Sequence, residues 1–240
     1  MKHKEYDNIE TACEKGLKFF YGKGVGQNFE QAKILFEISL NEGEIIAYYY
    51  LGLCHRYGLG CDVNHKKAFI FLKYAADEGI PEAKYQAACC YENGEGVENN
   101  EDMVWQLLEE AANEDVPDAQ YALGEKYIAL KPPDYDSAEK YWAMAANNGL
   151  AIAQLKLGLL YKDGIGVEKN EKLAIRLFKL AADQDLPEEQ YQLALMYEKK
   201  NGMFFNKQRQ IVDLLKKASE AGHEGAGEAL SRHSDNVNSR

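Results

Sequence analysis

Alanines recur along this chain at a nearly constant step. The series consists of Ala47, Ala83, Ala119 and Ala153, with Glu189 at the next step. The successive steps are 36, 36, 34 and 36 residues. A period of this size is typical of stacked copies of one supersecondary unit, in which each copy packs on its neighbours. The chain is therefore predicted to be a repeat array, and its function is expected on a surface rather than in a catalytic cleft.

One copy of the repeat, residues 47–82, contains two apolar stretches separated by glycines. The first covers residues 47–57, and the second covers about residues 65–78, where apolar residues recur at helical spacing. Gly79 follows the second stretch as a C-terminal cap, and Pro81 lies just before the next copy. Each repeat is therefore predicted to be a helix A, a glycine-containing loop, a helix B and a turn marked by proline.

The predicted fold is all-α: an α-α superhelix (solenoid) of about six helix-turn-helix repeats, followed by a C-terminal capping helix. Residues 1–10 form an N-terminal segment, and residues 226–240 are expected to form the capping helix and a polar tail. The six repeats occupy residues 11–225, divided into 11–46, 47–82, 83–118, 119–152, 153–188 and 189–225. The fourth repeat lacks the Gly-x-Gly loop, and Pro132–Pro133 stiffens that connection.

A small residue occupies the sixth position of helix A in every repeat. These residues are Gly16, Gly52, Ala88, Gly124, Gly158 and Ala194. Because a glycine inside a helix costs about 1 kcal/mol, its recurrence indicates that another helix approaches closely. An aromatic residue usually fills the ninth position, where we interpret it as a core wedge, and His55 replaces it in the second repeat.

The pattern A-x-Y-x-L-G-x-x-Y-x-x-G-x-G-V, followed by K-A and A-A, resembles the Sel-1-like repeat family. Residues 153–188 are close to its consensus, and the resemblance covers about residues 11–225. The family is similar to tetratricopeptide repeats, so the resemblance implies helix pairs stacked into a right-handed superhelix. It also implies scaffolding and adaptor work, often in signalling, protein quality control or bacterial virulence, and it carries no shared catalytic residues.

The resemblance further implies where a partner would bind. In the tetratricopeptide arrangement helix A lines the concave face, and its third, seventh and tenth positions point inward. The candidate partner-binding residues at the third and tenth positions are Tyr49, Arg56, Tyr85, Glu92, Tyr121, Lys162, Tyr191 and Glu198. Tyrosine suits an interface because it joins a large apolar area to a polar tip, although it can equally pack between helices here. The varied tenth position is the better candidate for specificity, since packing does not demand charged residues there.

Acidic residues are concentrated in the third repeat. The chain has a formal net charge of −11, and the segment between Lys84 and Lys126 holds eleven acids and no lysine or arginine. A candidate acidic patch consists of Glu98, Glu101, Asp102, Glu109 and Glu110. Such a patch disfavours nucleic acid and favours a basic protein partner. The alternative interpretation is a solvated, self-repelling helix face.

Catalysis finds little support in the sequence. The five histidines show no metal-ligand spacing, and no G-x-S-x-G motif occurs, so neither a metal, a cofactor nor an enzyme is predicted. No run of about 18 apolar residues is present, so no membrane span is expected. Five cysteines without a disulfide pattern, and an N-terminus unlike a signal peptide, favour the cytoplasm.

The leading functional hypothesis is a non-enzymatic scaffold or adaptor, bacterial and cytoplasmic, that binds a protein or peptide on its concave face. The alternative is a bacterial immunity protein (antitoxin) that neutralises a toxin through the acidic third repeat. The sequence leaves the oligomeric state open.

Overall fold

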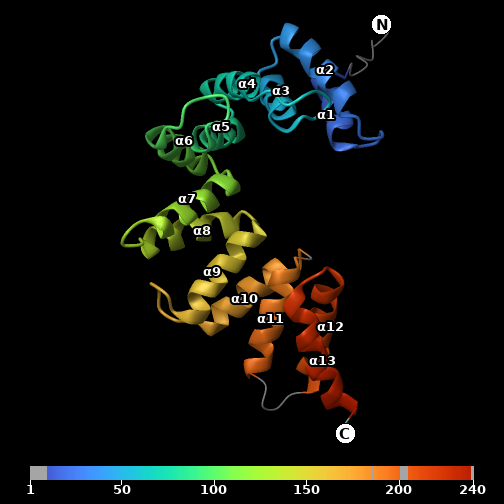
Figure 1. Cartoon of the computed structure of the whole chain (residues 1–240), viewed down its shortest axis with the longest axis vertical. Helices are drawn as coiled ribbons and strands as arrows, with labels where there is room; N and C mark the ends of the chain where they lie inside the picture. The colour runs from blue at the N-terminus through green and yellow to red at the C-terminus, as the bar shows by residue number, and fades with distance from the viewer. Residues whose placement is uncertain (1–9, 185, 201–204, 239–240) are drawn as a thin grey trace, which may run out of the picture. The chain divides into compact units, whose positions relative to one another are not determined.

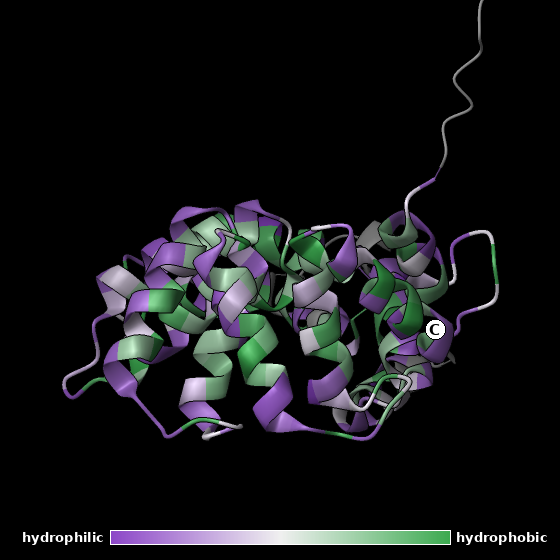
Figure 2. Ribbon diagram, turned by 90° about the horizontal axis from the view of Figure 1, so that it is seen from above, coloured by the Kyte–Doolittle hydropathy of each residue, from purple (hydrophilic) through white to green (hydrophobic). Residues whose placement is uncertain are grey.

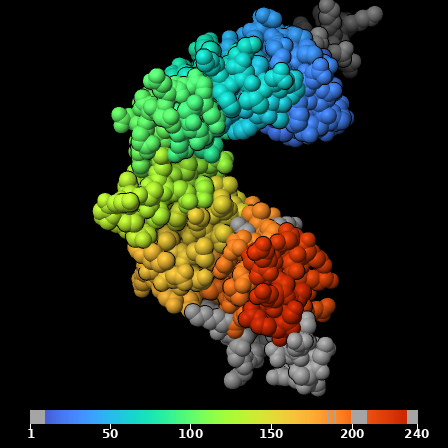
Figure 3. Space-filling view, in the orientation of Figure 1, coloured from blue at the N-terminus to red at the C-terminus, as the bar shows by residue number. Residues whose placement is uncertain are grey.

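The computed structural model describes residues 10–184, 186–200 and 205–238, and within these ranges it consists of thirteen helices and no strands (Figure 1). The helices form two compact units, Met1–Ala119 and Gln120–Arg240, whose boundary falls inside α7. In the space-filling view, the helix pairs of the N-terminal unit occupy successive blocks coloured from blue to green (Figure 3).

The helices alternate between the predicted A and B types. The N-terminal unit contains α1 (Ala12–Tyr21), α2 (Phe29–Asn41), α3 (Ile46–Tyr57), α4 (His65–Asp77), α5 (Pro81–Asn93), α6 (Glu101–Asn113) and the first turn of α7 (Pro117–Ala129). The C-terminal unit contains the rest of α7, α8 (Tyr135–Asn147), α9 (Ala151–Asp163), α10 (Glu171–Ala182), α11 (Pro187–Lys200), α12 (Phe205–Glu220) and α13 (Glu224–Asn238). Odd-numbered helices up to α11 are A helices, and even-numbered helices are B helices.

The final helix differs from its prediction. It begins at Glu224 and continues to Asn238, whereas the sequence predicted a polar tail over most of this stretch. The predicted N-terminal segment, residues 1–10, lies outside the described residues except for Glu10.

The alanines that define the repeat are fully buried. Ala47, Ala83, Ala119 and Ala153 each have 0% of their surface exposed. Each helix carries hydrophobic and hydrophilic segments, and several of the connecting loops are hydrophilic (Figure 2). The alanine period therefore marks one buried position that each repeat uses to pack on its neighbours.

An asparagine or aspartate caps the N-terminus of each helix B from α2 to α10, directly before the first helical residue. The sequence analysis did not single out these residues. The caps are Asn28, Asn64, Asn100, Asp134 and Asn170. Each side-chain oxygen accepts a hydrogen bond from the backbone N–H three residues later, at 3.0–3.1 Å. An N-terminal cap stabilises a helix by about 0.5–2 kcal/mol relative to alanine. These caps recur with the same steps as the alanines, so the signal was present in the sequence.

The second glycine of the Gly-x-Gly loop joins neighbouring repeats. Gly60, Gly96 and Gly166 have φ of 72°, 76° and 70°, a left-handed conformation that favours glycine. A Cβ atom on each would also collide with the first residue of the preceding helix B, which is Phe29, His65 or Tyr135. Gly24 has the same φ of 76°, but a Cβ there would meet nothing within 4 Å. Gly24 belongs to the first repeat, and no helix B precedes it among the described residues, so the contact accompanies the stacking of one repeat on another.

The sixth position of helix A faces a large side chain of helix B, as predicted. A Cβ on Gly16 or Gly158 would lie 2.7 or 2.6 Å from the ring of Phe36 or Phe178. A Cβ on Gly124 would lie 2.9 Å from Cγ of Trp142. The third repeat has an alanine at this position, Ala88, and the smaller Leu108 in place of the aromatic ring. A Cβ on Gly52 would likewise lie 2.6 Å from Cγ of Leu72, so the two positions share one volume in each repeat that has the glycine.

His55 lies in the core of the N-terminal unit, where other repeats have an aromatic ring. It is 8% exposed, and its ring stacks on Phe71 with centroids 5.7 Å apart. Its Nδ1 lies 3.5 Å from Sγ of Cys61. Burial lowers the pKa of His55, and the nearby Lys67 and Lys33 act in the same direction.

We expect His55→Phe to make the N-terminal unit less sensitive to acid. Because the folded-state pKa of His55 lies below its unfolded value of about 6.5, its contribution is complete above that value and is lost as pH falls through the folded pKa. The variant should therefore lose less Tm than the parent between about pH 7.5 and about pH 5. His65→Gln, which removes an exposed imidazole from the same unit, is the matched control. An unchanged pH dependence in His55→Phe would show that this histidine is not responsible.

Candidate protein-binding surface on the A helices

The tyrosines at the third position of helix A are partly packed. Tyr49, Tyr85, Tyr121 and Tyr191 are all half-buried. Burial raises the pKa of Tyr121 to about 12, and burial likewise raises the pKa of Tyr49 and Tyr85. The ring of Tyr191 lies 4.2 Å from the His223 ring, centroid to centroid. These residues therefore combine a packing role with a partly accessible surface.

Tyrosines line the A helices of the N-terminal unit. The tyrosine face consists of Tyr21 on α1, Tyr49, Tyr50 and Tyr57 on α3, and Tyr85 on α5. The hydroxyls of Tyr21 and Tyr50 lie 3.1 Å apart, and the rings of Tyr49 and Tyr50 meet edge-on at 5.1 Å. The Tyr57 hydroxyl donates a 3.2 Å hydrogen bond to Oε1 of Gln86 on α5. These contacts connect the face across three successive repeats.

The most exposed members of this face are residues that the sequence analysis missed. Tyr21 is 51% exposed and Tyr57 is 54% exposed, and both occupy the eleventh position of helix A. The prediction considered only the third, seventh and tenth positions. A signal was available, since Tyr21 and Tyr57 are separated by the repeat step of 36 residues. Stacking leaves about half of each side chain accessible, which suits a binding residue.

Arg56 does not occupy a free position. It is 8% exposed, its Nε donates to Oε2 of Glu95 at 2.6 Å, and its Nη1 donates to Oε1 of Gln86 at 2.5 Å. Burial alone would lower the pKa of Arg56, but the hydrogen bond to Glu95 and neighbouring groups raise it overall. The prediction that packing makes no demand at this position is therefore wrong for Arg56, which joins the second repeat to the third.

Other tenth-position residues also contact the following helices. Nζ of Lys162 lies 3.4 Å from Oε1 of Gln192, one repeat later, in the same arrangement as Arg56 and Gln86. Glu198 pairs with His233 on α13. Glu92 is exposed on α5. The fourth position of helix A is thus a polar partner for the tenth and eleventh positions of the preceding repeat.

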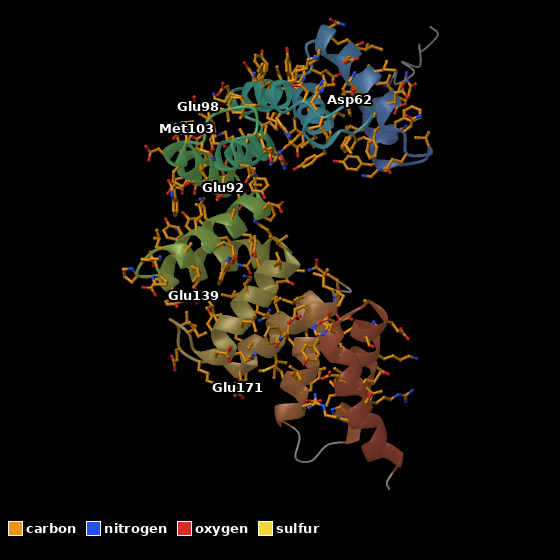
Figure 4. The ribbon with its side chains drawn as sticks, in the orientation of Figure 1. Asp62, Glu92, Glu98, Met103, Glu139 and Glu171 are labelled. Carbon is orange, nitrogen blue, oxygen red and sulfur yellow. The ribbon has the colours of Figure 1, made fainter. Side chains whose placement is uncertain are left out.

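The predicted acidic patch contains residues with different surroundings. Glu110 receives a 2.9 Å hydrogen bond from Gln106 and pairs with Lys84 at 3.2 Å, and together these lower its pKa despite partial burial. Glu98, Glu101, Asp102 and Glu109 are exposed. Glu101 and Asp102 lie in the first turn of α6, where the helix dipole stabilises carboxylates. Glu92, on α5, lies apart from Glu98, in the loop before α6, in the view of Figure 4.

Several acids between Lys84 and Lys126 form ion pairs with basic residues that lie outside this segment. Lys84 also pairs with Glu114 at 2.6 Å, Arg56 pairs with Glu95, and Lys156 pairs with Glu125 at 3.1 Å. These ion pairs offset part of the negative charge between Lys84 and Lys126. The exposed negative charge of the third repeat is concentrated on α6 and the loop before it.

The described residues show neither a metal site nor a membrane span. No group of three or more His, Cys, Asp or Glu side chains there is placed to hold a metal ion. Among the helices that the structure describes, none combines the length and apolar character needed to cross a bilayer.

The chain belongs to the Sel1 repeat family, whose model matches residues 16–44, 45–80, 81–116, 117–150 and 151–186. Four of the five matches start two residues earlier than the predicted repeats, in agreement with α5, α7 and α9, which begin at Pro81, Pro117 and Ala151, whereas the first match starts at residue 16 and the first predicted repeat at residue 11. The predicted sixth repeat is outside the matches, although α11 and α12 form a helix pair there. A comparison with curated proteins found no match.

Solved structures agree with this assignment. A Sel1 repeat protein from Oxalobacter formigenes is 28% identical, with a TM-score of 0.81 over 92% of this chain and 64% of its own, so the chain spans just under two thirds of that protein. The immunity proteins Pa5087 and PA5088 from Pseudomonas aeruginosa are 16% and 17% identical, with TM-scores of 0.56 and 0.58. The alignment with Pa5087 covers 85% of this chain and 82% of Pa5087. The alignment with PA5088 covers 87% of this chain and 83% of PA5088.

These comparisons confirm the predicted family and the all-α repeat superhelix. Sel1 repeats generally mediate protein–protein interaction and typically form non-catalytic scaffolds. The low identity to the two immunity proteins establishes a common fold only.

Proposed function

We propose that the chain is a non-enzymatic interaction scaffold that binds a protein partner on the A helices of its N-terminal unit. The observation that supports this most is the pair of half-exposed tyrosines, Tyr21 and Tyr57, at equivalent positions of successive repeats. Tyrosine contributes a large contact area at low entropic cost and is enriched among residues that dominate binding energy. The tyrosine face supplies such side chains on rigid helices rather than on loops, so it is organised before binding.

Site-specific photocross-linking in the native cell tests this proposal. A photoreactive amino acid replaces Tyr57 in one variant and Ile70 in the other. Ile70 on α4 is the matched control because it is a large apolar residue of the same unit and is 64% exposed. We expect one protein to be captured from position 57 and not from position 70. Capture from position 70 alone would place the partner on the B helices and overturn the assignment of the face.

A second candidate function is immunity against a toxin, carried by the exposed acids of α6 and of the loop before it. Glu98, Asp102 and Glu109 present negative charge there, whereas the tyrosine face lies on α1, α3 and α5, and a basic toxin surface would complement this charge. The shared fold with Pa5087 and PA5088 is compatible with this function.

Charge reversal tests the second candidate in cells that produce the captured protein. Glu98→Lys, Asp102→Lys and Glu109→Lys are combined, and the control combines Glu30→Lys, Asp62→Lys and Glu78→Lys, which reverse exposed acids elsewhere in the unit. Immunity through α6 predicts that growth protection fails in the first variant and persists in the second. Protection that is equal in both variants would eliminate the acidic patch as the neutralising surface.

A further inference from the structure

We infer that the tyrosine face recognises a basic, extended segment of a protein partner, whose arginine or lysine side chains pack on Tyr21 and Tyr57. This inference rests on the proposed function and specifies the chemistry of the partner at that face. It differs from the acidic-patch hypothesis in the surface that it uses, because the residues involved lie on α1, α3 and α5 rather than on α6.

The basic side chains of α3 and α5 already form ion pairs with acidic residues of this chain. Arg56, the arginine of α3, is buried against Glu95. Lys84, the lysine of α5, reaches Glu110 and Glu114 on α6. Neither helix therefore projects an uncompensated positive charge beside the tyrosines. A cationic ligand meets no repulsion from these two residues.

Two exposed carboxylates lie on α5 and α7. Glu82 lies in the first turn of α5 and Asp118 in the first turn of α7, and both side chains are exposed. After burial, the charge of Glu82 is the next largest influence that raises the pKa of Tyr49, and Asp118 acts on both Tyr49 and Tyr85. The carboxylates are thus close enough to act electrostatically on the tyrosine hydroxyls. Aromatic rings bordered by carboxylates complement a positively charged side chain.

The exposed rings already hold cations from this chain. Nζ of Lys23 lies 5.2 Å from the centroid of the Tyr21 ring, and the Arg56 guanidinium carbon lies 5.2 Å from that of Tyr57. Both distances are within the range of cation–π attraction. Each ring retains about half of its surface, at 51% and 54% exposure, for a second contact. Both rings therefore accept a cation in this chain, and a basic segment that binds Tyr21 has to displace or bypass Lys23.

Fluorescence anisotropy with three labelled peptides of equal length tests the inference. One peptide alternates arginine with glycine and serine, one replaces each arginine by glutamate, and one replaces it by glutamine. We expect only the arginine peptide to bind, and we expect its affinity to fall when NaCl rises from about 20 mM to about 300 mM. Tyr57→Leu should weaken binding by about three- to tenfold, whereas Tyr57→Phe, which keeps the ring, should change it less than about twofold.

A second set of variants separates this face from α6. The combination Glu98→Gln, Asp102→Asn and Glu109→Gln should leave the affinity for the arginine peptide within about twofold, because these acids lie on α6 and the loop before it. Loss of binding in this variant, with Tyr57→Leu unaffected, would overturn the inference. Equal binding of all three peptides, or binding of none, would also overturn it.

The proposed function and this inference can fail separately. A partner that cross-links at position 57 but binds independently of its basic residues would leave the function standing and contradict the inference. A dimer that dissociates when Tyr57 is replaced by leucine would identify a second copy of the chain as the occupant and would contradict both.

Discussion

Gly96→Ala is expected to destabilise the N-terminal unit by about 2 to 5 kcal/mol, the sum of left-handed backbone strain and overpacking. At φ 76° an L-residue is strained, and the new Cβ would lie 2.7 Å from the backbone nitrogen of Lys66 and closer still to the carbonyl of His65. Backbone atoms at the start of α4 cannot move aside without disturbing the cap at Asn64. The substitution should therefore separate the third repeat from the second.

Gly24→Ala is the matched control for this prediction. It imposes the same φ of 76° but introduces no contact within 4 Å, so it should cost only the backbone strain, about 1 to 2 kcal/mol. Urea unfolding is followed by tryptophan fluorescence in a Trp142→Phe background, which leaves Trp105 on α6 to report on the N-terminal unit. Equal costs for the two variants would show that the second glycine serves the turn alone and not the stacking of repeats.

Gly158→Ala is expected to destabilise the C-terminal unit by about 1 to 3 kcal/mol through overpacking, although alanine is the better helix former. The added Cβ would lie 2.6 Å from Cε1 of Phe178 and 2.9 Å from its Cδ1. Phe178 is fully buried, with 0% of its surface exposed, so its ring cannot swing into solvent. Fluorescence of Trp142 on α8, in a Trp105→Phe background, measures the loss.

The partner substitution Phe178→Leu should reverse this effect. It recreates the pairing of the third repeat, where Ala88 accompanies Leu108. In the Phe178→Leu background, Gly158→Ala should be neutral or stabilising, because the methyl group fills volume that the ring has vacated. The double-mutant cycle should give a coupling energy of about 1 to 3 kcal/mol. A coupling near zero would mean that the two residues do not share one volume.

Most of the fold could be predicted from the sequence because stacking repeats the same constraint in each copy. The alanine step, the small residue at the sixth position and the prolines each recur. The structure buries the alanines, packs the small residues against helix B, and places Pro81, Pro117 and Pro187 at the first position of α5, α7 and α11. The end of the array was harder to predict. The polar residues of α13 lack the apolar spacing of the repeats, yet His223 and His233 bind Glu188 and Glu198 of α11.

The candidate surface was only partly predictable. The sequence indicated the A helices and their tyrosines, but contacts between repeats determine which side chains remain accessible. Arg56 and Tyr57 are adjacent in the sequence, yet one is 8% and the other 54% exposed. Glu95 and Gln86, which hold Arg56, come from the next repeat and follow no motif. Pairings of this kind depend on the geometry of stacking.

The affinity of the cross-linked partner for two double variants tests the central claim most directly. Tyr21→Ala with Tyr57→Ala removes the exposed tyrosines of the A helices, and Ile34→Ser with Ile70→Ser removes equivalent apolar residues of the B helices, which are 43% and 64% exposed. We predict that the tyrosine variant loses at least about tenfold in affinity and that the isoleucine variant stays within about twofold of the parent. The reverse order, with binding lost in the isoleucine variant and kept in the tyrosine variant, would contradict the account.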